Sequence, residues 1–206
     1  MSWFGTVARK AANYTVEENL GTLTVSAQSI DPDDADAFGG VTVGYLSDTV
    51  YNGADQRFEP EVIDKDGKAL VKGRDYELSF SGDVKNVGEV TVTVVGKGNY
   101  AGSVERTYRI TPAPLTVTTE SANKVYDGKP LAAKVASAAV PTQDAVTIEY
   151  SLDGEKWTTD PGSLAATDVA DSATVQLRAS SPGNYEGYVY GSQQLSVTKR
   201  AVGLKE

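Results

Sequence analysis

The feature that most constrains this chain is an internal repeat, marked by two short motifs. An Asn-Tyr pair recurs at steps of 86 and 85 residues, at Asn13-Tyr14, Asn99-Tyr100 and Asn184-Tyr185. A second motif, a Val-Tyr pair followed by Asn or Asp and then by Gly, begins at Val50 and again at Val125. Because both motifs occur in the same order, we interpret the chain as tandem units of roughly 85 residues.

The segment from Gly88 to Pro112 indicates what each unit is made of. Valines at positions 90, 92 and 94 alternate with polar residues, which is the period-2 pattern of a half-buried β-strand. A Gly-rich turn at 96–99 leads into a second alternating run, whose apolar residues are Val104, Tyr108 and Ile110. This segment is predicted to be a β-hairpin. No stretch of the sequence has the apolar period of an amphipathic helix.

These patterns predict an all-β chain of tandem antiparallel β-sandwich modules with immunoglobulin-like architecture. A β-grasp-like module is the alternative, and it would need a helix across the sheet. We place the first module at residues 40–113 and the second at 114–200, with 201–206 beginning another repeat. We expect the modules to have separate cores joined near residues 111–114. The expected cores are Tyr76, Leu78, Phe80, Val90, Val92 and Val94 in the first module, and Val146, Ile148, Val175, Leu177, Leu195 and Val197 in the second.

The N-terminal part of the chain is predicted to be a remnant of a preceding unit. This remnant covers residues 1–30, with a two-stranded hairpin over residues 3–26, and an acidic linker follows at 31–39. Four carboxylates in this linker are candidate Ca²⁺ ligands, because hard cations prefer oxygen: Asp31, Asp33, Asp34 and Asp36. An EF-hand loop needs Gly at its sixth position, where this sequence has Asp36. A solvated linker is therefore the favoured interpretation.

The composition removes most of the groups that enzymes use. The sequence has no His and no Cys, so the usual general base, thiolate nucleophile and zinc ligands are missing. The acidic pairs fall in turns and linkers, and we predict no enzymatic activity and no cofactor. The net charge of −9, without any basic run, argues against nucleic acid as a partner. No apolar run reaches the length of a transmembrane helix, and we expect no membrane insertion in this segment.

Aromatic residues supply the remaining candidates for a binding site. The candidates lie in the second unit and are Trp157, Tyr185, Tyr188 and Tyr190. Exposed rings of this kind can stack on sugars or anchor a protein partner. Burial in the core is the favoured interpretation, because most aromatic residues in strands pack inward.

Several short motifs lie at the predicted turns of the two units: Val50-Tyr51-Asn52-Gly53, Val125-Tyr126-Asp127-Gly128, Gly73-Arg74-Asp75-Tyr76, Gly96-Lys97-Gly98-Asn99-Tyr100 and Gly183-Asn184-Tyr185. Together they resemble the MBG/YDG-type tandem repeats of bacterial cell-surface, adhesin-like proteins. The likeness covers nearly all of residues 40–200. The second unit departs from the first, because the Gly-Arg-Asp-Tyr motif at 73–76 has no clear counterpart there.

The resemblance implies a non-catalytic extracellular segment that acts as a stalk or spacer on a bacterial cell surface. Its partners would be neighbouring repeats of the same chain, and the signal and anchor would lie outside this fragment. The alternative is an adhesin module that binds a host glycan or an extracellular-matrix protein. An adhesin should expose a contiguous aromatic patch, whereas a spacer should present mostly small polar and charged side chains.

Overall fold

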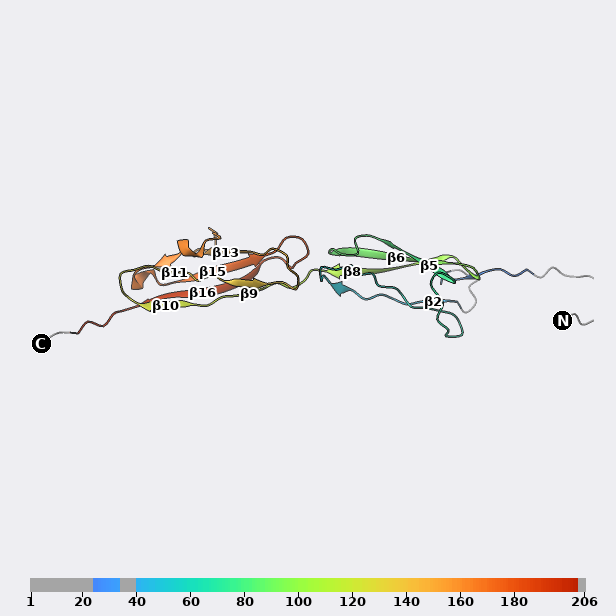
Figure 1. Ribbon diagram of the computed structural model, residues 1–206, viewed down its shortest axis with the longest axis horizontal. Coiled ribbons are helices and arrows are strands. Elements are labelled where there is room, and N and C mark those ends of the chain that lie inside the picture. Colours follow the sequence, from blue (N-terminus) through green and yellow to red (C-terminus); the bar gives the residue numbers. More distant parts are fainter. Residues whose placement is uncertain (1–23, 34–39, 204–206) are drawn as a thin grey trace, which may run out of the picture.

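The computed structural model describes residues 24–33 and 40–203, which form two β-rich modules arranged one after the other along a single long axis (Figure 1). We call residues 28–112 the first module and residues 113–198 the second module. Apart from two single-turn 3-10 helices, the elements in these described residues are all β-strands. The predicted all-β, β-sandwich class is confirmed, and within residues 24–33 and 40–203 no helix crosses a sheet as a β-grasp module would require.

The first module has two layers. Its main sheet has the strand order β3-β8-β6-β5 and consists of β3 (Thr49–Val50), β5 (Tyr76–Ser81), β6 (Gly88–Gly96) and β8 (Ser103–Thr111). The short strands β2 (Thr42–Val43) and β4 (Val62–Ile63) pair with each other and form the second layer. At the outer end of the module, β1 (Gln28–Ser29) pairs with β7 (Tyr100–Ala101).

The second module repeats this plan. Its main sheet has the order β10-β16-β15-β13 and consists of β10 (Ala122–Val125), β13 (Thr147–Ser151), β15 (Ala173–Ser180) and β16 (Val189–Thr198). Here β9 (Thr116–Thr118) pairs with β12 (Ser137–Ala139) as the second layer. The longer middle of this unit adds β11 (Leu131–Ala132), β14 (Ala165–Ala166) and the 3-10 helices η1 (Pro161–Ser163) and η2 (Val169–Asp171). The main sheets of the two modules thus have corresponding strand orders.

The core of the first module follows the alternation read from the sequence. Val90, Val92 and Val94 on β6 are fully buried, while Leu78 and Phe80 on β5 are half-buried. Each fully buried side chain of this size stabilises the fold by roughly 1.5–3 kcal/mol. Val43 on β2 and Val62 on β4 pack on this face and close the sandwich.

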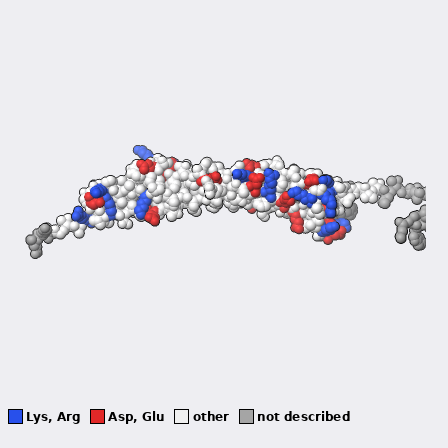
Figure 2. Space-filling model, in the orientation of Figure 1, with Lys and Arg blue, Asp and Glu red and all other residues white. Residues whose placement is uncertain are grey.

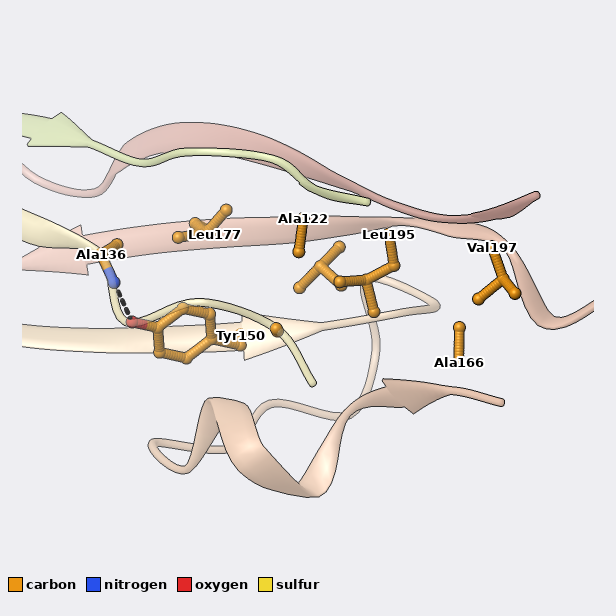
Figure 3. Packing of buried hydrophobic residues seen from close by; sticks show 9 residues of the cluster. Ala122, Ala136, Tyr150, Ala166, Leu177, Leu195 and Val197 are labelled. Carbon is orange, nitrogen blue, oxygen red and sulfur yellow. Dashed lines mark hydrogen bonds between the residues drawn. The ribbon is translucent and has the colours of Figure 1, made fainter. Parts of the chain in front are cut away.

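The second module has a core of smaller side chains (Figure 3). Leu177 and Leu195 from the two central strands are fully buried, and several alanines allow the layers to approach closely. Tyr150 is buried at one end of this core, and its hydroxyl accepts a hydrogen bond of 2.8 Å from the backbone N–H of Ala136 (Figure 3). A buried hydroxyl that finds such a partner avoids the cost of desolvation.

The pairing differs from the predicted antiparallel scheme at the edges of the sheets. β3 runs parallel to β8, β10 runs parallel to β16, and β1 runs parallel to β7. The sheets are therefore mixed. An alternating apolar pattern specifies which face is buried, but it does not specify the direction of the neighbouring strand.

The predicted boundary at the start of the first module needs correction. Ile30, assigned from sequence to the preceding remnant, is 1% exposed and packs in the first core. The Gln28 N–H donates to Asn99 O at 2.8 Å, and the Ile30 N–H donates to Ala101 O at 2.8 Å. Residues 28–30 therefore belong to the first module. The predicted hairpin over residues 3–26 lies almost entirely outside the described residues, as do part of the acidic linker and residues 204–206.

Candidate functional site

The two modules meet in a small, well-packed joint. Tyr51, which follows β3, packs edge-on against Tyr185 of the second module, with ring centroids 5.6 Å apart and an interplanar angle of 85°. Tyr185, Ala113 and the half-buried Val140 continue the core cluster that contains Val90. The prediction of wholly separate cores is wrong in this respect, because one cluster of the first module extends across the joint.

Asp144 accepts hydrogen bonds from three hydroxyl groups of the joint. Its Oδ2 accepts hydrogen bonds from Tyr185 at 2.6 Å, from Thr142 at 2.7 Å and from Tyr51 at 3.3 Å. The bond from Tyr185, followed by the bond from Thr142, lowers the pKa of the Asp144 carboxyl below its ordinary value. Burial, together with the nearby carboxylate, raises the pKa of Tyr185. Both shifts favour the arrangement in which the tyrosine donates to an ionised carboxylate.

Asn184 supplies the second set of contacts across the joint. Its Oδ1 accepts a hydrogen bond of 2.8 Å from the Val87 N–H, and its Nδ2 donates to Asn86 Oδ1 at 2.8 Å. Its backbone oxygen accepts from Ala113 N–H at 2.9 Å, where the chain enters the second module. An amide side chain can donate and accept at once, and Asn184 uses both functions on the loop before β6.

The two sequence motifs are thus the two halves of one joint. The Val-Tyr motif of the first module contributes Tyr51, and the Asn-Tyr motif of the second module contributes Asn184 and Tyr185. The sequence revealed that each motif recurs. It gave no indication that the Val-Tyr motif of one unit contacts the Asn-Tyr motif of the following unit. The contribution of Asp144 was missed altogether, because it lies in a loop with no counterpart among the recurring motifs.

A separate aromatic surface lies on the outer face of the second module. Glu149 on β13, Arg178 on β15 and Tyr190 on β16 are direct cross-strand neighbours. Arg178 Nε donates to Glu149 Oε2 at 2.7 Å, and this bond is the main cause that raises the Arg178 pKa further above its ordinary value. Such cross-strand ion pairs stabilise a sheet modestly.

Two further rings surround the Arg178 guanidinium. Its centre lies 4.2 Å from the ring of Trp157 and 4.6 Å from the ring of Tyr188. The ring centroids of Tyr188 and Tyr190 are 6.4 Å apart, and the two residues are 49% and 67% exposed. We call Trp157, Arg178, Tyr188 and Tyr190 the aromatic surface. Aromatic rings held by a cation in this way form a contiguous exposed patch.

The structure therefore divides the four aromatic candidates into two groups. Trp157, Tyr188 and Tyr190 come together on the aromatic surface, whereas Tyr185 is 7% exposed and belongs to the joint. The sequence did not point to Arg178 or Glu149, because strand register is needed to place them among the rings. Of the four linker carboxylates, only Asp31 and Asp33 are described. There the Asp33 N–H donates to Asp31 Oδ1 at 3.0 Å, a local turn contact.

The two sites bring together groups that form hydrogen bonds and ring contacts: hydroxyls, a carboxylate and an amide at the joint, and rings around a guanidinium on the aromatic surface. The described part of the chain contains no group of three or more acidic residues arranged to hold a metal ion. Within the same residues, no helix is long and apolar enough to cross a membrane. Lys and Arg side chains lie beside Asp and Glu on the face shown in Figure 2, without a continuous stretch of either sign.

Comparisons with known proteins give no family assignment. No protein-family model matches the chain, and no curated protein matches it. Among solved structures, DIP-gamma IG1+IG2 aligns with a TM-score of 0.31 and 8% identity, over 77% of this chain and 97% of that one. Sidekick-1 immunoglobulin domains 1–5 align with a TM-score of 0.33 and 15% identity, over 77% of this chain and 39% of that one. Drosophila N-cadherin EC1-3 aligns with a TM-score of 0.33 and 11% identity, over 75% of this chain and 65% of that one.

Proposed function

We propose that this chain is a non-catalytic extracellular repeat segment that acts as a stalk or spacer in a bacterial surface protein. The observation that carries the proposal is the joint, which holds two repeats end to end. The bacterial and cell-surface parts of the proposal come from the resemblance to MBG/YDG-type repeats. The surface of mixed charge in Figure 2 also suits a solvated spacer.

A spacer needs resistance to bending, and the joint supplies it through several kinds of contact at once. Ring packing between Tyr51 and Tyr185 removes apolar surface from water, while Asn184 fixes the angle of approach through two directional hydrogen bonds. A flexible linker would hold the modules together without these contacts. We therefore expect the two modules to tumble as one elongated body.

The test compares two asparagines that occupy the same place in their repeats. Asn184→Ala removes both side-chain hydrogen bonds of the joint, whereas Asn99→Ala changes the equivalent exposed residue at the outer end of the first module. We expect residual dipolar couplings of the parent and of Asn99→Ala to fit one alignment tensor for both modules. Asn184→Ala should require two tensors. Independent tumbling of the modules in the parent would contradict the proposal.

The aromatic surface supports a second candidate function, that of an adhesin module for a host glycan or a matrix protein. The contiguous, exposed rings around Arg178 are the pattern that an adhesin would show. The contacts within this surface also explain it as a cross-strand ladder that stabilises the sheet. Spacer and adhesin therefore differ in whether Tyr188 and Tyr190 bind anything.

A glycan array decides between these functions. The parent is compared with the double variant Tyr188→Ala/Tyr190→Ala, and Tyr45→Ala in the first module serves as control. Tyr45 is 90% exposed, and its ring centroid also lies close to an arginine, 4.8 Å from Arg106 Cζ. For a spacer we expect no sugar to bind the parent more strongly than it binds the double variant. A signal that is lost in the double variant and kept in Tyr45→Ala would favour the adhesin.

A further inference from the structure

The second module carries, at its far end, the same half of a joint that the first module uses. Tyr51 N–H donates to Thr111 O at 2.9 Å, and Tyr126 N–H donates to Thr198 O at 2.9 Å. Each tyrosine follows the edge strand that runs parallel to the last strand of its module. Tyr126 is therefore the structural counterpart of Tyr51.

The two tyrosines differ in what covers them. Tyr51 is 5% exposed because Tyr185 of the next module packs on it, whereas Tyr126 is 39% exposed. Tyr126 borders a hollow of about 570 Å³. Val169, Ala170 and Val202 supply its apolar lining, and the charged residues Asp168, Lys199 and Arg200 also line it. The 3-10 helix η2 holds Val169 and Ala170 just before β15. In the first module, the loop that holds Asn86 and Val87 stands just before β6 and binds Asn184.

The segment after β16 repeats the entry segment of a module. Ile30 stands two residues after Gln28, which pairs with Tyr100, and Leu115 stands two residues after Ala113, which pairs with Tyr185. Both are core residues, with exposures of 1% and 4%. Leu115 follows Thr111 by four residues, and Val202 follows Thr198 by the same number. Val202 is 88% exposed and lines the same hollow as Tyr126.

We propose that the hollow at Tyr126 is a docking face for a further module of the same kind, following in the same chain. This inference rests on the proposed spacer function and names the partner that extends it. The incoming module presents its Asn-Tyr turn, with the tyrosine packed on Tyr126 and the asparagine on the backbone of η2. Its first core residue is supplied by Val202.

A second copy of this chain is a poorer occupant. In the first module, the place beside Asn99 and Tyr100 is already taken by Gln28 and Ile30, whose N–H groups bond to Asn99 O and Ala101 O. A separate copy therefore arrives with its entry segment in place and would compete with residues 200–202 for the same backbone. A module that follows covalently uses those residues as its own entry segment and meets no such conflict.

The test extends the chain after Val202 with a second copy of residues 116–198, so that Val202 takes the place of Leu115. Because the sequence has no cysteine, one introduced thiol gives a clean readout. Val169→Cys, at a residue that lines the hollow and is 39% exposed, should react with a thiol reagent at least ten times more slowly in the extended chain than in the parent. Adding Tyr126→Ala should restore fast labelling. A second extension, with residues 31–111 after Val202, guards against misfolding of one added unit.

Two control thiols separate this inference from the proposed function. Tyr190→Cys, on the aromatic surface, should react at the same fast rate in both chains. Ala113→Cys, at a fully buried position of the existing joint, should react slowly in both chains. Equal rates for Val169→Cys in all chains, with Ala113→Cys still slow, would overturn the docking face and leave the spacer standing. Fast labelling of Ala113→Cys would overturn the spacer itself. Labelling of Val169→Cys that slows with the concentration of the parent would assign the face to a second copy and overturn the proposal.

Discussion

At the scale of single residues, Asp75 shows how one carboxylate holds a turn. It accepts a hydrogen bond of 2.9 Å from the Val71 N–H. It also accepts hydrogen bonds from Nε and Nη2 of Arg74, at 2.9 Å and 2.7 Å. The bonds from Arg74, followed by the bond from Val71, lower the pKa of Asp75 to about 2 from an ordinary value of 3.8. Asp75 is 8% exposed and lies immediately before the first residue of β5.

This shift makes a prediction about acid stability. Because the folded-state pKa lies below the unfolded one, the stabilisation is fully present above about pH 4 and is lost as the pH falls through 2. Asp75→Asn should melt below the parent at pH 6, and the difference in Tm should shrink between pH 4 and pH 2. Asp66→Asn, which changes the net charge equally at an exposed turn, is the control. A difference in Tm that stays constant from pH 6 to pH 2 would show that Asp75 acts through packing alone.

At the scale of elements, the sequence predicted the long strands, but it did not predict which strands the short ones pair with. Alternation over β6 and β8 is long enough to identify Val90, Val92, Val94, Tyr108 and Ile110 as inward-facing, and all five are buried. Strands of two residues, such as β1 and β3, are too short to show any alternation. Their positions depend on parallel pairing with residues about 60 to 70 positions away, which leaves no local pattern.

The candidate sites show the same division. Recurrence identified Tyr51 and Tyr185 as marked positions, and their aromatic side chains made Trp157, Tyr188 and Tyr190 candidates for binding. The pairing of Tyr51 with Tyr185 depends on how one module follows another, and the place of Arg178 depends on the register of β13, β15 and β16. Both are properties of three-dimensional arrangement. Motif spacing therefore located the joint residues without revealing the joint.

At the scale of the whole molecule, each module has its own core, and one core cluster of the first module extends to Ala113, Val140 and Tyr185 of the second. Val92→Asp places an unpaired carboxylate at a position with 0% exposure, at a cost of roughly 3–5 kcal/mol. We expect the first module to melt at a much lower temperature. The second module should keep its core and lose only the contacts of the joint, so the single variant should show two transitions.

Trp157 makes these transitions separable. With Trp3 replaced by Phe, it is the one tryptophan left and reports on the second module, while circular dichroism follows both. Thr91→Asp, on the opposite face of β6 between Ser81 and Thr107, is the matched control and should melt near the parent. Simultaneous loss of both signals in Val92→Asp would mean that the two modules fold as one unit. An unchanged melting temperature would mean that the inward face is wrongly assigned.

The central position of the last strand in each sheet has a mechanical consequence. β8 lies between β3 and β6, and β16 lies between β10 and β15, with both strands running along the long axis (Figure 1). A pull on the chain beyond Thr198 is therefore taken up as shear along two ladders at once, where many hydrogen bonds must break together. Forced unfolding depends on the rate of that event rather than on equilibrium stability. A segment arranged in this way can bear tension without relying on disulfides, which a sequence lacking cysteine does not have.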